Sequence, residues 1–263
     1  MLPTVDSTNN YAIGQATAGE AGHGTVYFAL EQTAGKGQRG KTWLTTTGEN
    51  IMMSVVLHPH PLKTSQQFLL SAAIALGCYD FFKNYAGEET SIKWPNDLYW
   101  RDRKAGGILI ESRIRSSESG VQSSEPKAST ASYQSSTQNS ELTTHDWIIA
   151  IAGMGININQ TKFAPEALRP VSLKQITGKT YDINALAREL CHHLEKRYQA
   201  IRNPEQLLAD YHQALYKKGK SVKLKKGTSV FETTIQGVTQ TGELITQDTL
   251  ERYFQVGEIE WII

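Results

Sequence analysis

The sequence predicts an α+β protein that ends in a small all-β module. Apolar residues recur at helical spacing over residues 65–85 and 183–202, while the short apolar runs elsewhere in the first 217 residues are typical of strands. After residue 220, short alternating runs are separated by glycines, which is typical of a small β-barrel. A chain of 263 residues is long enough for one large domain and one small one.

Composition narrows the class of protein. The chain is 39% hydrophobic and 20% charged, with a net charge of +1, so we expect a soluble globular protein and no general affinity for nucleic acid or membranes. The first residues lack the pattern of a signal peptide, and no apolar run reaches the length of a membrane span. Cys78 and Cys191 lie far apart and outside any CxxC pattern. We therefore expect a cytoplasmic protein without a disulfide framework or zinc site.

The first polar motif is the run Asp6-Ser7-Thr8-Asn9. These residue types cap helix N-termini, so the run predicts a short helix that ends near Ala18. Strands are expected over residues 26–31 and 50–58. A cap alone would explain the motif, and the pattern by itself does not assign it a ligand.

A glycine-rich loop connects these two strands. Residues 35–43 read GKGQRGKTW, with three glycines alternating with basic residues and a closing tryptophan. Glycine permits close backbone approach, so the loop could wrap an anion with its own N–H groups, and Lys36, Arg39 and Lys41 add positive charge. A solvated surface hairpin is the alternative.

Charged residues also lie at the ends of the next predicted strands. Strands are expected over residues 91–94, 98–100 and 107–111, with a turn at residues 95–97. Lys93, Asp97 and Lys104 therefore lie where a rigid scaffold usually presents its functional side chains.

Two contrasting segments follow. Ten serines and few apolar residues lie between positions 116 and 140, so we expect a long flexible insertion over residues 116–141. Residues 147–151 then predict a buried strand, and residues 153–159 (GMGININ) alternate glycine with asparagine. This alternation favours close approach of the backbone to a ligand, with a bulge or turn as the alternative. Helices are expected over residues 172–178, 183–202 and 204–217.

Four motifs in this order closely resemble biotin protein ligase, also called biotin–[acetyl-CoA-carboxylase] ligase. They are STN at residue 7, EQTAGKGQRGKTW, KWPNDLYWRDRKAGGIL and GMGININ. The resemblance spans nearly the whole chain apart from the serine-rich insertion. It implies a catalytic domain over residues 1–217, related to class II aminoacyl-tRNA synthetases, with a mixed sheet flanked by helices. It also implies an SH3-like β-barrel domain over residues 218–263.

The resemblance implies an enzyme that converts biotin and MgATP to biotinyl-5′-AMP. It then transfers the biotin to one lysine of a biotin carboxyl carrier domain, such as that of acetyl-CoA carboxylase. Some family members carry an N-terminal winged-helix DNA-binding domain. Because STN begins at residue 7, we expect a monofunctional ligase, a monomer or homodimer, without a nucleic-acid or membrane partner.

Site residues are carried over from the family motifs position by position. The catalytic residues implied are Lys104, Lys36 and Asp97. The biotin-binding residues implied are Ser7, Thr8, Asn9, Gln32, Lys36, Gly37, Gln38, Lys104 and Gly107. The ATP-binding residues implied are Arg39, Lys41, Trp43, Lys93, Asn96 and Asn157. Mg²⁺ is expected on the ATP phosphates, with no protein side chain assigned to it.

Gln38 departs from the family pattern, because many members have a basic residue there. It can donate hydrogen bonds but adds no charge, so we expect the loop, acting as a lid, to hold the acyl-adenylate less tightly. Two alternatives remain open. One is a lipoate–protein ligase, which shares the fold and reaction type, and the other is a non-catalytic module that binds biotin or its carrier.

Overall fold

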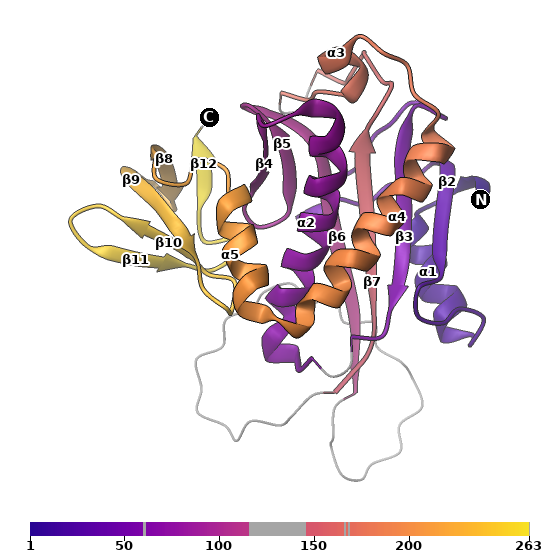
Figure 1. Cartoon of the computed structure of the whole chain (residues 1–263), viewed down its shortest axis with the longest axis horizontal. Coiled ribbons are helices and arrows are strands. Elements are labelled where there is room, and N and C mark those ends of the chain that lie inside the picture. The colour runs from indigo at the N-terminus through magenta and orange to yellow at the C-terminus, as the bar shows by residue number, and fades with distance from the viewer. Residues whose placement is uncertain (60–61, 116–145, 166, 168, 263) are drawn as a thin grey trace.

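The structure, a computed structural model, describes residues 1–59, 62–115, 146–165, 167 and 169–262 (Figure 1). The serine-rich insertion expected over residues 116–141 lies outside the described residues. A large sheet, a layer of helices and a second, smaller sheet make up the molecule.

The larger sheet has seven strands in the order β1-β2-β3-β7-β6-β5-β4. Strand β1 is parallel to β2 and all other neighbours are antiparallel, so the mixed sheet expected from the sequence is confirmed. The strands are β1 (Leu2–Val5), β2 (Val26–Gln32), β3 (Asn50–Leu57), β4 (Thr90–Lys93), β5 (Asp97–Trp100), β6 (Arg103–Arg115) and β7 (Asp146–Asn157).

Helices cover both faces of this sheet unequally. Helices α2 (Gln67–Ala86), α4 (Ile183–Gln199) and α5 (Pro204–Ala214) form one layer, which lies in front of the sheet in Figure 1. The short helix α1 (Thr8–Thr17) packs on the opposite face against β2, β3 and β7, and α3 (Leu173–Thr177) contacts the end of α2. Apolar stripes of helical period predicted helices over residues 65–85 and 183–202. These helices are confirmed as α2 and α4.

Strand β3 shows how the two faces differ. Met53 and Val55 point into the main core on the side that α4 covers, whereas Val56 belongs to a small cluster with Ala12 of α1. Because successive side chains alternate across a strand, Ser54 also lies on the α1 side. All eight residues of β3 are buried, so this strand anchors both layers.

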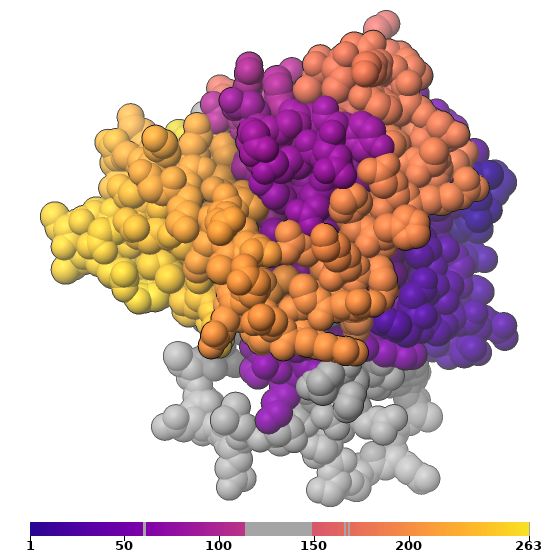
Figure 2. Space-filling view, viewed as in Figure 1, coloured from indigo at the N-terminus to yellow at the C-terminus, as the bar shows by residue number. Residues whose placement is uncertain are grey.

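The chain ends in a five-stranded antiparallel sheet of order β11-β10-β9-β8-β12. Figure 2 shows this sheet packed directly against the helical layer, and the His212 ring of α5 hydrogen-bonds the backbone of Val238 in β9. The all-β C-terminal module is therefore confirmed. Its strands are β8 (Ser221–Lys226), β9 (Ser229–Val238), β10 (Leu244–Gln247), β11 (Glu251–Phe254) and β12 (Glu260–Ile262).

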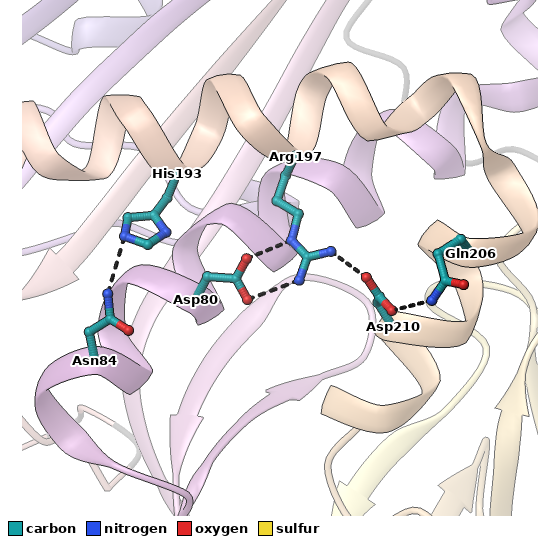
Figure 3. Close-up of polar contacts among 6 residues, drawn as sticks. All are labelled: Asp80, Asn84, His193, Arg197, Gln206 and Asp210. Atoms are coloured by element: carbon teal, nitrogen blue, oxygen red, sulfur yellow. Dashed lines mark hydrogen bonds and ion pairs between the residues drawn. The ribbon is translucent and has the colours of Figure 1, made fainter.

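One arginine joins the three main helices. The Arg197 guanidinium of α4 donates from Nε to Asp80 of α2 at 2.5 Å and from Nη1 to Asp210 of α5 (Figure 3). Their side chains are 17–25% exposed, so the cluster is largely shielded from water. Burial raises the pKa of Asp210, but hydrogen bonds from Arg197 and Gln206 outweigh it and the net pKa is lowered.

We expect Arg197→Met to lower the free energy of unfolding by about 2 kcal/mol at neutral pH. The variant keeps the apolar stem but leaves two carboxylates without their cation in a half-buried setting. The depressed pKa of Asp210 means that its stabilisation is complete above its unfolded value and is lost as pH falls through its folded value. Urea unfolding at pH 7 and pH 3 should therefore show a difference that shrinks in acid.

The matched control is Arg202→Met, which removes an exposed guanidinium at the end of the same helical segment. It should change stability by less than about 0.5 kcal/mol. Equal unfolding curves for the two variants would show that the three-helix ion pair contributes nothing.

Candidate active site

All the residues that the sequence analysis assigned to a site line one cavity of about 700 Å³. The cavity lies on the α1 side of the large sheet, between the glycine-rich loop and the C-terminal sheet. The structure thus brings these residues together from six separate segments, although their individual roles stay predictions. They are Ser7, Thr8, Asn9, Gln32, Lys36, Gly37, Gln38, Arg39, Lys41, Trp43, Lys93, Asn96, Asp97, Lys104, Gly107 and Asn157.

The floor of the cavity is a part of the sheet that has almost no side chains. Strand β7 continues through the GMGIN segment, so this motif is a strand and neither a bulge nor a turn. Gly153 and Gly155 face the cavity, while Met154 between them packs into the main core. A Cβ at Gly155 would lie 2.5 Å from the Trp43 ring, so only glycine allows the indole to rest on this strand.

The loop over residues 35–43 is a hairpin closed by its own backbone. The Gly37 N–H donates to Lys41 O at 2.6 Å, and the Trp43 N–H donates to Gly35 O at 2.8 Å. These two amides are therefore taken up inside the loop, which differs from the amide cradle expected from the glycines. Arg39 occupies the left-handed region at the tip, and its side chain packs against Gly257 of the C-terminal module.

The N-terminus of α1 supplies a second group of polar side chains. Gln32 Oε1 accepts from the Thr8 N–H at 2.7 Å and from the Thr8 hydroxyl at 3.1 Å. Ser7 occupies the N-cap position, but among the described residues its hydroxyl caps no backbone N–H of α1. The run is thus more than a helix cap, because the Ser7 side chain, 2% exposed, lines the cavity.

Glu111 is a residue that the sequence analysis missed. One carboxylate oxygen accepts from Asn9 Nδ2 at 2.7 Å, and the other lies 3.4 Å from Lys36 Nζ. Asn9 Oδ1 accepts in turn from Ser54 Oγ at 2.6 Å, so both ends of the Asn9 amide are engaged by the protein. Glu111 follows Gly107 at strand period on β6, and this alternation was the available signal.

Lys104 and Asp97 form an ion pair in the lining of the cavity, with Nζ and Oδ1 2.7 Å apart. An irregularity in the β5–β6 ladder makes this possible, because Leu98 pairs with Gly106 and Tyr99 with Lys104. The extra residue, Ala105, shifts the strand phase, so Lys104 and Gly107 both line the cavity although they are three positions apart. Lys104 Nζ also lies 5.8 Å from the centre of the Trp43 ring.

Lys93 is a second ammonium in the cavity, and it is more deeply enclosed. It donates to Tyr99 Oη at 3.2 Å, and burial lowers its pKa to about 8 despite the opposing influence of Asp97. Its charge is therefore lost nearer neutral pH than that of a free lysine. Lys104 and Lys41 also lower the pKa, as neighbouring positive charges do.

The two asparagines predicted to bind ATP, Asn96 and Asn157, hydrogen-bond to the backbone around the cavity. Asn96 Nδ2 donates to Ile108 O, and Asn157 Nδ2 donates to Val171 O at 3.1 Å. Both side chains are more than nine-tenths buried. These bonds tie the ends of β5 and β7 to neighbouring backbone, so the amide nitrogens are already engaged by the protein.

The C-terminal sheet forms one wall of the cavity. Its contribution comes from the segment that leads into β12, and no cavity-forming pattern marks that segment in the sequence. The lining residues from this module are Val256, Gly257, Ile259, Glu260 and Trp261.

The described chain has no cluster of three His, Cys, Asp or Glu side chains placed to hold a metal, and none of its helices could cross a membrane.

Comparison with known proteins gives one family and a set of relatives. Residues 1–122 match the model of the biotin/lipoate A/B protein ligase family. The chain is 32% identical over 183 residues to the bifunctional ligase/repressor BirA of Bacillus spizizenii, a match that covers 68% of this chain and 47% of that protein. It is 29% identical over 211 residues to the biotin–[acetyl-CoA-carboxylase] ligase of Mycobacterium tuberculosis, which covers 78% of this chain and 66% of the relative. The chain thus spans about half the length of the first curated relatives that it matches.

Solved structures share the fold over the whole chain. Biotin protein ligase from Aquifex aeolicus in complex with biotin and ATP superposes with a TM-score of 0.75 at 21% identity, covering 99% of this chain and 97% of that one. The enzyme from Leishmania major in complex with biotinyl-5-AMP gives 0.59 at 22% identity, covering 100% and 97%. At these identities the likeness establishes the fold, and it agrees with the α+β class predicted from the sequence.

Proposed function

We propose that the chain is a member of the biotin/lipoate A/B protein ligase family, whose model it matches over residues 1–122, and that it acts as a biotin–protein ligase. In the proposed reaction, biotin and ATP give biotinyl-5′-AMP and pyrophosphate. The biotinyl group then passes to a lysine of a biotin carboxyl carrier domain, and AMP leaves. The observation that carries the proposal is the meeting of all the predicted site residues, including the Lys104–Asp97 pair, in one cavity.

The first step requires a cationic site, because a carboxylate must approach a phosphate. The cavity supplies such a site, with five basic side chains along its lining: Lys36, Arg39, Lys41, Lys93 and Lys104. Asp97 and Glu111 pair with two of these side chains, and Glu260 adds a third carboxylate to the lining. Five positive charges therefore face three negative ones, and the balance favours an anion. Fixed positive charge in an enclosed site reduces the repulsion between the two reactants and stabilises the charge that develops.

The polar residues at the other side of the cavity fit the ureido ring of biotin. Such a ring needs both donors and acceptors on an otherwise apolar surface. Ser7, Thr8 and Gln32 provide hydroxyl and amide groups there. The side-chain oxygen of Gln32 accepts from Thr8, so its amide nitrogen is the group that can donate to a ligand. Mg²⁺ would arrive on the ATP phosphates, where it would neutralise part of their charge.

Biotin-dependent exchange of radiolabelled pyrophosphate into ATP tests this function directly. We expect exchange with biotin and none with lipoate. Exchange with lipoate alone would make the protein a lipoate–protein ligase instead. A protein that binds biotin with micromolar or better affinity but supports no exchange would be a non-catalytic binding module.

The second step needs the acceptor lysine as a neutral amine, and Asp97 is the carboxylate placed to orient it or accept its proton. We expect Asp97→Asn to slow biotin transfer from preformed biotinyl-AMP to a carrier domain by about 10²-fold, the scale of general-base catalysis. Single-turnover transfer of labelled biotin measures this step without adenylation.

Glu260→Gln is the matched control, because Glu260 is an exposed carboxylate that lines the same cavity from the C-terminal sheet. Its transfer rate should stay within about twofold of the unmutated protein. An Asp97→Asn variant with unchanged transfer would refute the proposed role, and Asp97 would then act only by holding Lys104.

A further inference from the structure

Two aromatic rings from different sheets enclose the ammonium of Lys93. Its Nζ lies 5.0 Å from the centre of the Tyr99 ring on β5 and 5.4 Å from the centre of the Trp261 ring on β12. Both distances are within the range of a cation–π interaction. Lys93 belongs to β4 of the seven-stranded sheet. The C-terminal sheet therefore provides one of the two aromatic rings that face this residue of the candidate active site.

The position of Trp261 is itself fixed from several directions. Its backbone pairs with Leu224 of β8, and its ring lies 5.7 Å from that of Tyr216 in the segment between α5 and β8. The Tyr216 hydroxyl donates to Asp102 at 2.6 Å, and its backbone N–H donates to Ile92 O beside Lys93. The aromatic contact thus belongs to a packed junction between the two sheets.

Lys93 has no carboxylate within ion-pair distance in the part of the chain that the structure describes. Asp97 lies opposite it in the β4–β5 ladder, but that carboxylate is engaged by Lys104. An aromatic face stabilises a cation without neutralising it, so the Lys93 charge stays free to bind an anion in the cavity. In the proposed function, the substrate anion that Lys93 would bind is the polyphosphate of the nucleotide.

We propose that Trp261 is a positioning residue that holds the Lys93 ammonium toward the polyphosphate of ATP, so that the C-terminal sheet completes the nucleotide end of the site. This inference rests on the proposed function of the cavity. It predicts that the aromatic face of residue 261 matters for ATP and not for biotin.

The test compares Trp261→Leu, which removes the aromatic face, with Trp261→Phe, which keeps one. Biotin-dependent pyrophosphate exchange gives KM for ATP and KM for biotin separately, and calorimetric titration with MgATP gives affinity without turnover. We expect Trp261→Leu to raise KM and Kd for ATP about tenfold, which corresponds to about 1.4 kcal/mol, and to leave KM for biotin within twofold. Trp261→Phe should stay within about threefold for both substrates.

Trp100→Leu is the matched control. Trp100 also faces a cation, with Arg101 4.6 Å from its ring centre, and its indole N–H donates to Ala86 O away from the cavity. It should leave both KM values unchanged. Thermal unfolding of all three variants verifies that each is folded.

The outcomes separate the inference from the function on which it rests. No exchange by the unmutated protein would refute the proposed function, and the MgATP titration would still report on Trp261. An active protein whose Trp261→Leu variant binds ATP normally would overturn the inference. Equal loss of ATP and biotin affinity would also overturn it, as would a Trp261→Phe variant as impaired as Trp261→Leu, because neither pattern requires an aromatic face beside Lys93.

Discussion

Lys104→Ala is expected to lower biotin-dependent pyrophosphate exchange by about 10²–10³-fold while the protein stays folded. Lys104 lines the cavity with its Nζ 2.7 Å from Asp97, and in the proposed reaction its charge would stabilise the biotin carboxylate and the α-phosphate as they approach each other. Loss of one preorganised charge at a reacting centre usually has an effect of this size. The side chain is 29% exposed and outside the apolar core, so its removal should change the free energy of unfolding by less than about 1 kcal/mol.

Two further variants make the result specific to this ammonium. Lys179→Ala removes an exposed lysine outside the cavity lining and should retain full exchange. Lys104→Arg keeps the charge but replaces a compact ammonium by a planar fork, so we expect partial activity. A Lys104→Ala variant with normal exchange would refute the proposed role of this ammonium in adenylation.

The sequence predicted the elements of the fold well, for a physical reason. Burial imposes a period on each element, so the apolar stripe of α2 and the alternating runs of β8 to β12 were visible in the sequence. The order of strands in the sheet was not visible. It depends on contacts between distant segments, such as β3 with β7, whose registers are set by the assembled core.

The site could be predicted only in part. Motif resemblance found the residues that line the cavity, and the structure confirms that they meet. It could not show how Lys104 and Gly107 come to line the same cavity, because that depends on the extra residue in the β5–β6 ladder. Nor did the glycines of the loop reveal that the Gly37 and Trp43 amides bond within their own hairpin, because a pattern of glycines allows either arrangement.

The C-terminal module shows the same limit from another direction. Its sequence predicted a small β structure, but gave no sign that Gly257 would contact Arg39 or that Trp261 would reach Lys93. These contacts join segments more than 160 residues apart. Only the packing of the second sheet against the helical layer, visible in Figure 2, places them at the cavity.

Gly155→Ala is expected to weaken ATP binding about tenfold or more without unfolding the protein. The added Cβ would lie 2.5 Å from Cε2 of the Trp43 ring and 2.7 Å from its Nε1, closer than real carbon contacts allow. The indole ring is rigid, so it must move away from β7 as a unit. The backbone of Trp43 is meanwhile held in place, because its N–H donates to Gly35 O. Trp43 is one of the residues predicted to bind ATP, so the nucleotide should lose an aromatic contact.

Gly14→Ala is the matched control, because a Cβ at that position in α1 meets no atom within 4 Å. It should leave ATP affinity unchanged and increase helix stability by up to about 1 kcal/mol. A double-mutant cycle with Trp43→Ala then identifies the cause. If displacement of the indole is the whole effect, Gly155→Ala should cost little in the Trp43→Ala background, because the atoms that it would strike are gone. A full, additive loss in that background would instead mean that Gly155 contacts the nucleotide itself, and the role of the glycine would be to admit the ligand and not the tryptophan.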